Sequence, residues 1–267
     1  MQPRFSITVG KRKGYVRTSI LDKYENGGQM QRIPRSGFDN CDRRVYKITR
    51  GSEEFIFKSV SCLLEDGETK SYLREDFYIQ MKFSGSGVVK MIDYRENEDN
   101  EIGEFTIEAL YEYFGENLLS LIEREEEAKN IMNMMTSVAF TMKRLQQLNI
   151  SHGDLKPGNM VTKDGIVKLI NFGLAREFFT ASQLDESITE KGRTGVYTPP
   201  EIIRNPGKTG KRPVKIDVFC WGMSLYRLIT YKSIPDLEED YNLRVLSKDY
   251  PKFLEKVKNI VVMVMIA

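Results

Sequence analysis

The chain has 267 residues, of which 40% are hydrophobic and 29% are charged, and its formal net charge is +2. This length accommodates one large domain or two lobes that share a core, and the composition is typical of a globular protein. Because the charge is nearly balanced and Lys and Arg are spread along the sequence, we expect no nucleic-acid partner.

The cysteines and the apolar segments indicate where the protein resides. Cys41, Cys62 and Cys220 have no paired spacing, and no signal-like leader is recognisable. These features favour an intracellular protein of the cytoplasm or nucleus. The longest apolar run, Ile260–Ala267, is far shorter than the ~20 residues that a membrane-spanning helix needs, so we expect no membrane span.

Residues 1–28 form a basic N-terminal extension in our domain assignment. The first 20 residues hold five basic side chains and no acidic one. The simpler interpretation is a solvated extension, and the alternative is a docking arm for an acidic partner.

The next segment has the pattern of a β-rich unit. Arg44–Thr49 and Glu54–Val60 alternate between apolar and polar residues, and Gly51-Ser52 between them is typical of a hairpin turn. A helix is predicted over 68–83, strands over 88–94 and 104–112, and an acidic turn over 96–101.

After Gly115 the pattern becomes helical. Between Ile131 and Leu148 the apolar residues recur at intervals of three and four, which predicts an amphipathic helix. Asp217–Thr230 is apolar almost all round and predicts a helix buried on every side, with Asp217 as its N-cap. A β-rich part followed by a helical part is an α+β chain.

The segment Ser151–Met160, SHGDLKPGNM, carries the clearest chemistry. Asp154, Lys156 and Asn159 follow the single histidine, His152, at offsets of two, four and seven residues. Phosphoryl transfer needs a carboxylate for the acceptor hydroxyl, a cation near the migrating group and oxygen ligands for magnesium. These three residues supply one group of each kind within one loop.

This loop resembles the catalytic loop of protein kinases, and Ile170-Asn171-Phe172-Gly173 resembles their magnesium-binding turn. The resemblance continues in family order over about residues 29–260. It implies a bilobal kinase fold, with a β-rich N-lobe over about 29–114 and a helical C-lobe over about 115–267. It also implies ATP and Mg²⁺ as cofactors and a protein serine or threonine hydroxyl as acceptor, since Lys156 two residues after Asp154 is the serine/threonine-kinase version. Asp154, Lys156 and Asn159 would be catalytic, and Asn159 and Asn171 would hold the metal.

The resemblance also implies a nucleotide site. Lys58, in Phe55-Ile56-Phe57-Lys58, would hold the α- and β-phosphates, and Glu75 would pair with it, or Asp76 if the helix register differs by one. Tyr111 would occupy the gatekeeper position. The residues that would contact the nucleotide are Val45, Ile56, Val161 and the hinge residues Glu112 and Phe114.

Several residues depart from the family pattern. Asn171 replaces the aspartate that chelates magnesium, and Ile56 replaces an alanine that lies over adenine. The phosphate-covering loop keeps only Gly37, so either Arg43 or Arg44 contacts phosphate in its place or both are solvated. Gly153 replaces an arginine that receives activation-loop phosphate, so phosphorylation at 180, 182, 187 or 189 would lack its usual cationic partner.

The end of the sequence departs from the pattern as well. Tyr197-Thr198-Pro199-Pro200-Glu201 resembles the end of the activation segment, but the arginine that pairs with Glu201 in the family has no counterpart after the helix expected from Pro251. We therefore expect a shortened C-terminal end. Ile260–Ala267 is then either an exposed adhesive surface or an ordinary buried helix end.

These features support three functional hypotheses. The intact Lys58, Glu75, Asp154, Lys156 and Asn159 favour a serine/threonine kinase, whereas Asn171, Ile56, the missing glycines and the expected shortened C-terminal end favour impaired catalysis. The alternatives are a pseudokinase that scaffolds a protein partner and a domain that binds ATP without turning it over. If the chain is impaired, we expect nucleotide and metal binding to be the steps that fail.

Overall fold

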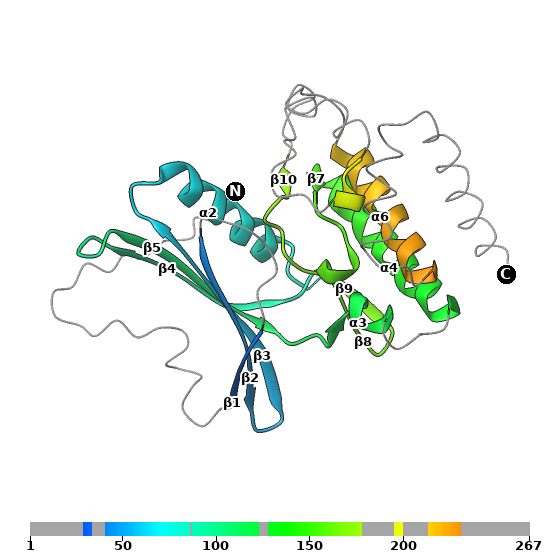
Figure 1. Ribbon diagram of the computed structural model, residues 1–267, viewed down its shortest axis with the longest axis horizontal. Helices are drawn as coiled ribbons and strands as arrows, with labels where there is room; N and C mark the ends of the chain where they lie inside the picture. The colour runs from blue at the N-terminus through cyan, green and yellow to red at the C-terminus, as the bar shows by residue number, and fades with distance from the viewer. Residues whose placement is uncertain are drawn as a thin grey trace, which may run out of the picture.

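A computed structural model describes residues 29–33, 41–85, 87–122, 128–177, 195–199 and 213–230 (Figure 1). The predicted extension over 1–28, Gly37, Glu201 and the residues from Pro251 onward lie outside these ranges. Within them, no helix has both the length and the apolar character needed to cross a membrane.

The N-terminal part is an antiparallel sheet with one helix against it, as the strand patterns predict. The sheet has five strands in the order β1-β2-β3-β5-β4. Helix α2 (Gly67–Lys82) begins where the Asp66 carboxylate accepts a hydrogen bond from the Thr69 amide, and it lies across the sheet (Figure 1). The strands are β1 (Gln29–Arg32), β2 (Asp42–Arg50), β3 (Glu53–Leu63), β4 (Met91–Asp99) and β5 (Glu104–Glu112).

The predicted acidic turn over 96–101 is wrong in its first half, because strand β4 continues to Asp99. Charge explains the difference. Arg74 on α2 forms ion pairs with Glu96 at 2.8 Å and with Glu98 at 3.2 Å, and Lys70 also contacts Glu98 at 3.2 Å. The acidic residues of β4 therefore face cations of the neighbouring helix, and the strand persists through them.

Both faces of the sheet are covered by apolar side chains. On one face, Leu73 and Phe77 of α2 pack against Val60 of β3 and Phe105 of β5. On the other face a smaller cluster forms around Phe57. Each fully buried side chain of this kind contributes ~1.5–3 kcal/mol through removal from water, so α2 and the sheet stabilise one another.

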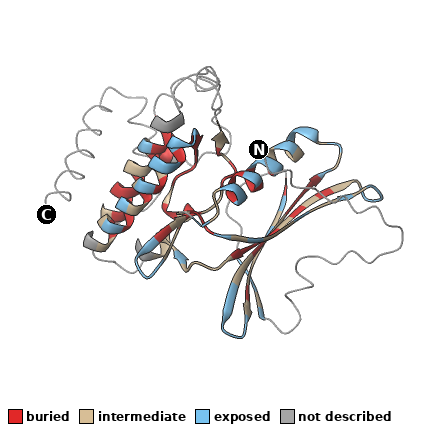
Figure 2. Ribbon diagram, turned by 180° about the vertical axis from the view of Figure 1, so that it is seen from behind, coloured by how far each residue is buried: buried red, intermediate tan, exposed pale blue. Residues whose placement is uncertain are grey.

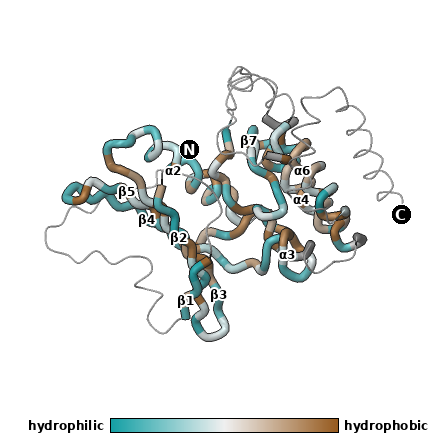
Figure 3. The backbone as a smooth tube through the Cα atoms, viewed as in Figure 1, coloured by the Kyte–Doolittle hydropathy of each residue, from teal (hydrophilic) through white to brown (hydrophobic). Residues whose placement is uncertain are grey.

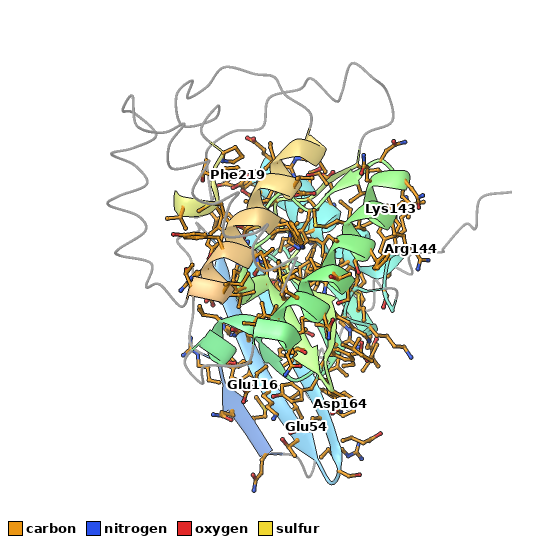
Figure 4. The ribbon with its side chains drawn as sticks, turned by 90° about the vertical axis from the view of Figure 1, so that its right-hand side faces the viewer. Glu54, Glu116, Lys143, Arg144, Asp164 and Phe219 are labelled. Carbon is orange, nitrogen blue, oxygen red and sulfur yellow. The ribbon has the colours of Figure 1, made fainter. Side chains whose placement is uncertain are left out.

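The C-terminal part contains α3 (Leu118–Ile122), α4 (Ala128–Gln147) and α6 (Pro213–Thr230). The amphipathic helix is confirmed: its apolar stripe is buried against α6, and hydrophobic and hydrophilic residues alternate along α4 (Figures 2 and 3). Lys143 and Arg144 project from its outer side (Figure 4). Leu148, predicted to end the stripe, follows the helix and is 43% exposed.

Helix α6 corrects two predictions. It begins at Pro213, so Asp217 lies within the helix and is not its N-cap. Val218 is 55% exposed, so the helix is not buried on every side. The Asp217 side chain instead faces the loop after β7 (Ile150–Ser151), which explains why a carboxylate sits in a largely apolar helix.

The two parts join at the segment that follows the C-terminal end of α2. Leu169 donates its amide to the Gly87 carbonyl at 2.8 Å and accepts from the Val89 amide at 3.1 Å. Gly87 has φ +77°, and a Cβ there would lie 2.1 Å from Thr141 Oγ1 of α4. This close approach fixes the end of α2 on the helical part and brings β3 opposite the loop that carries Asp154.

Candidate active site

The loop between β7 and β8 (Met160–Lys163) gathers the three predicted catalytic residues around one oxygen. Asp154 Oδ2 accepts from Lys156 Nζ at 2.8 Å and from Asn159 Nδ2 at 2.8 Å. Asn159 ends a short 3-10 turn, η1 (Pro157–Asn159), which orients its amide toward Asp154. Both of these contacts are made to Oδ2, and Oδ1 is the other oxygen of the same carboxylate.

The two predicted metal ligands also lie together. Asn171 follows β9 (Ile166–Leu169), and its Nδ2 donates to Asn159 Oδ1 at 3.3 Å. Its φ is +66°, a left-handed conformation that asparagine adopts more readily than most residues. The described residues contain no group of three or more His, Cys, Asp or Glu arranged to hold a metal ion.

Asp217 organises the backbone of this loop. Its carboxylate accepts hydrogen bonds from the His152 amide at 2.8 Å, the Gly153 amide at 2.8 Å and Ser151 Oγ at 3.0 Å. Burial raises the pKa of Asp217, while His152 and the hydrogen bonds it accepts act in the opposite direction. Asp217 therefore holds three consecutive residues immediately before Asp154.

Sequence reasoning missed this role of Asp217, although a signal was present. An isolated carboxylate between apolar helical residues such as Ile216 and Cys220 requires hydrogen-bond donors if it is buried. As an N-cap, Asp217 would accept hydrogen bonds from backbone amides of its own helix. The structure supplies them from a loop more than sixty residues earlier in the chain.

Gly153 is required by its surroundings. It has φ +78°, and a Cβ at this position would lie 2.2 Å from the Leu174 carbonyl oxygen. The segment after Asn171 thus passes too close for any side chain at 153. The backbone around Leu174 therefore requires glycine at position 153, where the family pattern has arginine.

His152 connects the catalytic loop to the segment that contains Asn171. Its Nε2 donates to the Ile170 carbonyl at 3.0 Å, which leaves Nδ1 as the acceptor for the Asp154 amide at 3.3 Å. Its ring lies 4.7 Å from the Phe172 ring, measured between centroids. Burial lowers the pKa of His152, although Asp217 and Asp154 oppose the shift. The neutral ring is the form that fits, because a proton on Nδ1 would face the Asp154 N–H.

This arrangement predicts acid sensitivity. Because the folded-state pKa of His152 is lowered, its contribution to stability is present above its ordinary pKa near 6.5 and is lost as pH falls. We expect the free energy of unfolding, measured by urea denaturation, to decrease between pH 7.5 and 5.5.

The control is His152→Gln, which removes the chain's single histidine and should flatten this pH dependence. The raised pKa of Asp217 contributes with the opposite sign and remains in the variant. A pH dependence that is identical in both proteins would contradict the prediction.

The partner predicted for Lys58 needs correction. Lys58 Nζ lies 3.2 Å from Asp76 Oδ2, while Glu75 faces solvent. Residues 75 and 76 point about 100° apart on a helix, and the packing of Leu73 and Phe77 turns position 76 inward. Asp76 is therefore the ion-pair partner, as the alternative register proposed.

The predicted nucleotide contacts surround Lys58. Val45 lies directly opposite Lys58 in the pairing of β2 with β3, so both side chains point to the same face. On that face Ile56, Phe114 and Val161 pack against the cluster that contains Tyr111. Residues from both parts of the molecule thus line one apolar surface beside Lys58.

Glu112, which the resemblance predicts to be a hinge residue, has a structural contact that the sequence did not reveal. Its carboxylate forms an ion pair with Lys168 Nζ at 2.5 Å and accepts from the Lys90 amide at 2.8 Å. The Lys168 ammonium also lies 4.1 Å from the centre of the Phe114 ring. The Glu112 side chain therefore ties the end of β5 to β9.

A second link joins α2 to the segment after Asn171. Lys82 forms an ion pair with Glu177 of β10 (Arg176–Glu177) at 2.6 Å. The Arg176 guanidinium lies 5.2 Å from the centre of the Tyr72 ring. These contacts hold α2, and with it Asp76, in the position that reaches Lys58.

Comparisons with known proteins agree with this geometry. A model of the family described as protein kinase domain matches residues 43–258. The serine/threonine-protein kinase MPS1 of Encephalitozoon cuniculi is 27% identical over 219 residues, which cover 81% of this chain and 34% of that protein. A probable serine/threonine-protein kinase mps1 of Dictyostelium discoideum is 27% identical over 200 residues, covering 69% of this chain and 19% of that protein. The chain thus spans about a third and about a fifth of the length of these two relatives.

Proposed function

Because this chain belongs to the protein kinase domain family, we propose that it transfers the γ-phosphoryl group of ATP to a serine or threonine hydroxyl of a protein, at a rate well below that of an ordinary member. The convergence of Lys156 and Asn159 on Asp154 Oδ2 carries this proposal. The names of the two relatives above, both serine/threonine-protein kinases, favour this acceptor.

Each residue has a distinct part in the proposed reaction. Asp154 accepts the proton of the substrate hydroxyl through its carboxylate. Lys156, held on the same carboxylate, places its positive charge beside the migrating phosphoryl group. Lys58 holds the α- and β-phosphates and is itself fixed by Asp76.

The slow rate follows from the metal ligands. Asn159 and Asn171 would hold the magnesium ion, whose charge would stabilise the transferring phosphates. Mg²⁺ prefers charged oxygen, and Asn171 offers an amide in place of a carboxylate. Loss of one such electrostatic contact lowers the rate by ~10²–10³, so we propose detectable but slow transfer against the ~1–100 s⁻¹ of ordinary kinases.

A second candidate function rests on the same asparagine. If the amide fails to retain the metal, the domain acts as a pseudokinase that binds a protein partner, or binds ATP without turning it over. The Lys58–Asp76 pair favours a nucleotide-binding domain over a scaffold that binds no ATP. The convergence of Lys156 and Asn159 on Asp154 favours the enzyme over both alternatives, because neither needs a group that accepts the proton of a hydroxyl.

The proposal is tested by two measurements on the same protein. Mg-ATP is titrated in a thermal-shift assay, and radiolabelled phosphate transfer to casein and to the chain itself is then followed. We expect an ATP-dependent shift and slow transfer that disappears in Asp154→Asn. Transfer that is equal in this variant would indicate a contaminating kinase, and the absence of both the shift and the transfer would favour the pseudokinase.

The ion pair at Lys58 gives a matched pair of variants. Asp76→Ala should lower the rate of transfer by at least ~10-fold, because Lys58 loses the carboxylate that orients it. It should also destabilise the fold by ~3 kcal/mol, since a largely buried cation loses its partner. Glu75→Ala should change stability by less than ~0.5 kcal/mol and leave the rate unchanged. Larger losses of rate and stability in Glu75→Ala than in Asp76→Ala would show that Glu75 is the functional partner of Lys58.

A further inference from the structure

Two cysteines stand opposite one another at the end of the β2–β3 ladder. Asp42 pairs with Ser61 and Arg43 pairs with Val60, in antiparallel register. In such a ladder, one step back along β2 corresponds to one step forward along β3. Cys41, the residue before β2, therefore faces Cys62 of β3.

The two thiols also lie on the same side of the sheet. Cys41 and Cys62 belong to one buried cluster together with Val60, Leu73 and Phe77, and each cysteine is only 7% exposed. Residues directly opposite in an antiparallel pair have Cα atoms ~4.5–5.5 Å apart, and a disulfide spans Cα separations of ~4.4–6.8 Å. The backbone thus needs little adjustment to join them.

We propose that Cys41 and Cys62 form a reversible disulfide that fastens the start of β2 to β3. The structure holds both as thiols, which is the reduced state of the pair. Burial raises the pKa of the Cys62 thiol, and the neighbouring Cys41 raises it further. Because only a thiolate exchanges with a disulfide, the raised pKa makes the pair slow to oxidise.

A glutathione disulfide is a sufficient oxidant for this reaction. One cysteine thiolate attacks a sulfur of the oxidised glutathione, forms a mixed disulfide and releases one glutathione thiolate. The second cysteine, as its thiolate, attacks the protein sulfur of that mixed disulfide and releases the second glutathione. The protein loses two thiol protons and two electrons, and one oxidised glutathione becomes two reduced molecules.

The position of the bond gives it a structural effect. Lys58 lies on the same face of β3 as Cys62, with Val60 between them. A bond at 41–62 therefore closes a covalent loop through the hairpin that presents Lys58. Such a loop restricts the unfolded chain, and we expect oxidation to raise the melting temperature by ~5–10 °C. This outcome does not depend on whether the domain transfers phosphate.

Peptide mapping of the full chain tests the proposal. The native protein is equilibrated with mixtures of reduced and oxidised glutathione, its remaining thiols are alkylated, and it is digested without reduction. We expect a single cross-linked peptide that contains Cys41 and Cys62, lighter by two hydrogen atoms than the two separate peptides, and restored to them by dithiothreitol. Glutathione adducts without a cross-link, intermolecular pairs of either cysteine, or thiols that stay unmodified would each overturn the proposal.

Three serine variants complete the experiment. Cys41→Ser and Cys62→Ser should each abolish the rise in melting temperature on oxidation. Cys220→Ser is the matched control, because Cys220 is also buried but lies in α6, where its sulfur donates to the Tyr197 carbonyl at 3.1 Å. Its oxidation-dependent shift should equal that of the unmodified sequence. If a variant fails to fold, the mapping of the native chain still decides the result.

Discussion

Replacing Asn171 with aspartate should raise the rate of phosphoryl transfer by ~10²–10³, the largest gain we expect from a single substitution. The variant provides a charged oxygen at position 171, and the neighbouring predicted metal ligand, Asn159, supplies only an amide oxygen. Because the left-handed backbone of residue 171 also suits aspartate, the substitution requires no change of conformation. Radiolabelled transfer at saturating Mg-ATP measures the effect.

A second readout separates metal binding from turnover. The Asn171 amide donates to Asn159 Oδ1, and an aspartate there would place two acceptors against each other. Without magnesium, Asn171→Asp should therefore lose ~0.5–1.5 kcal/mol of stability. When magnesium is added, the free energy of unfolding of this variant should rise by more than that of the native chain. A variant whose stability and rate are both unaffected by magnesium would show that residue 171 is not a metal ligand.

Replacing Asp217 with alanine should destabilise the domain by about 3–5 kcal/mol, the largest loss among our predictions. The His152 and Gly153 amides and the Ser151 hydroxyl would each lose an acceptor, and a buried unpaired donor costs ~1–3 kcal/mol. The loop before Asp154 would then lose its anchor, so transfer should fall together with stability. Urea denaturation gives the free energy of unfolding.

Two controls identify the cause of this loss. Ser151→Ala removes one of the three bonds and should cost about 1 kcal/mol. Asp217→Asn keeps the shape and one acceptor oxygen, so its loss should be intermediate. A cost below about 1 kcal/mol for Asp217→Ala would mean that the loop is held by other contacts.

Among the described residues, the longer strands and helices were largely predictable because their signals are local, whereas the short elements β1, α3 and β7 to β10 were not predicted. Glu104–Glu112 and the helix from Ala128 have apolar patterns of a single period, and the structure has both. The strand ending at Asp99 was less predictable, since its acidic residues favour a turn until the cations of α2 are placed beside them. Local pattern reports a segment's own preference, and tertiary charge pairing can override it.

In the candidate site, too, the features that depend on local sequence were predictable and those that depend on tertiary contacts were not. The sequence alone indicated Asp154, Lys156 and Asn159, because the chemistry lies within one short loop. The choice between Glu75 and Asp76 required the rotation of α2, which packing sets. The anchoring role of Asp217 required knowledge of which loop passes its side chain, and no spacing within the sequence encodes such a meeting.

Gly153 has a consequence for how this lineage can change. Glycine codons differ from arginine codons by one nucleotide, so mutation can offer arginine at this position readily. The carbonyl of Leu174, 2.2 Å from where a Cβ would stand, forbids it. Introduction of a phosphate-receiving arginine would need a prior displacement of the backbone around Leu174. Until that occurs, control by phosphorylation through this position is closed to the descendants of this sequence.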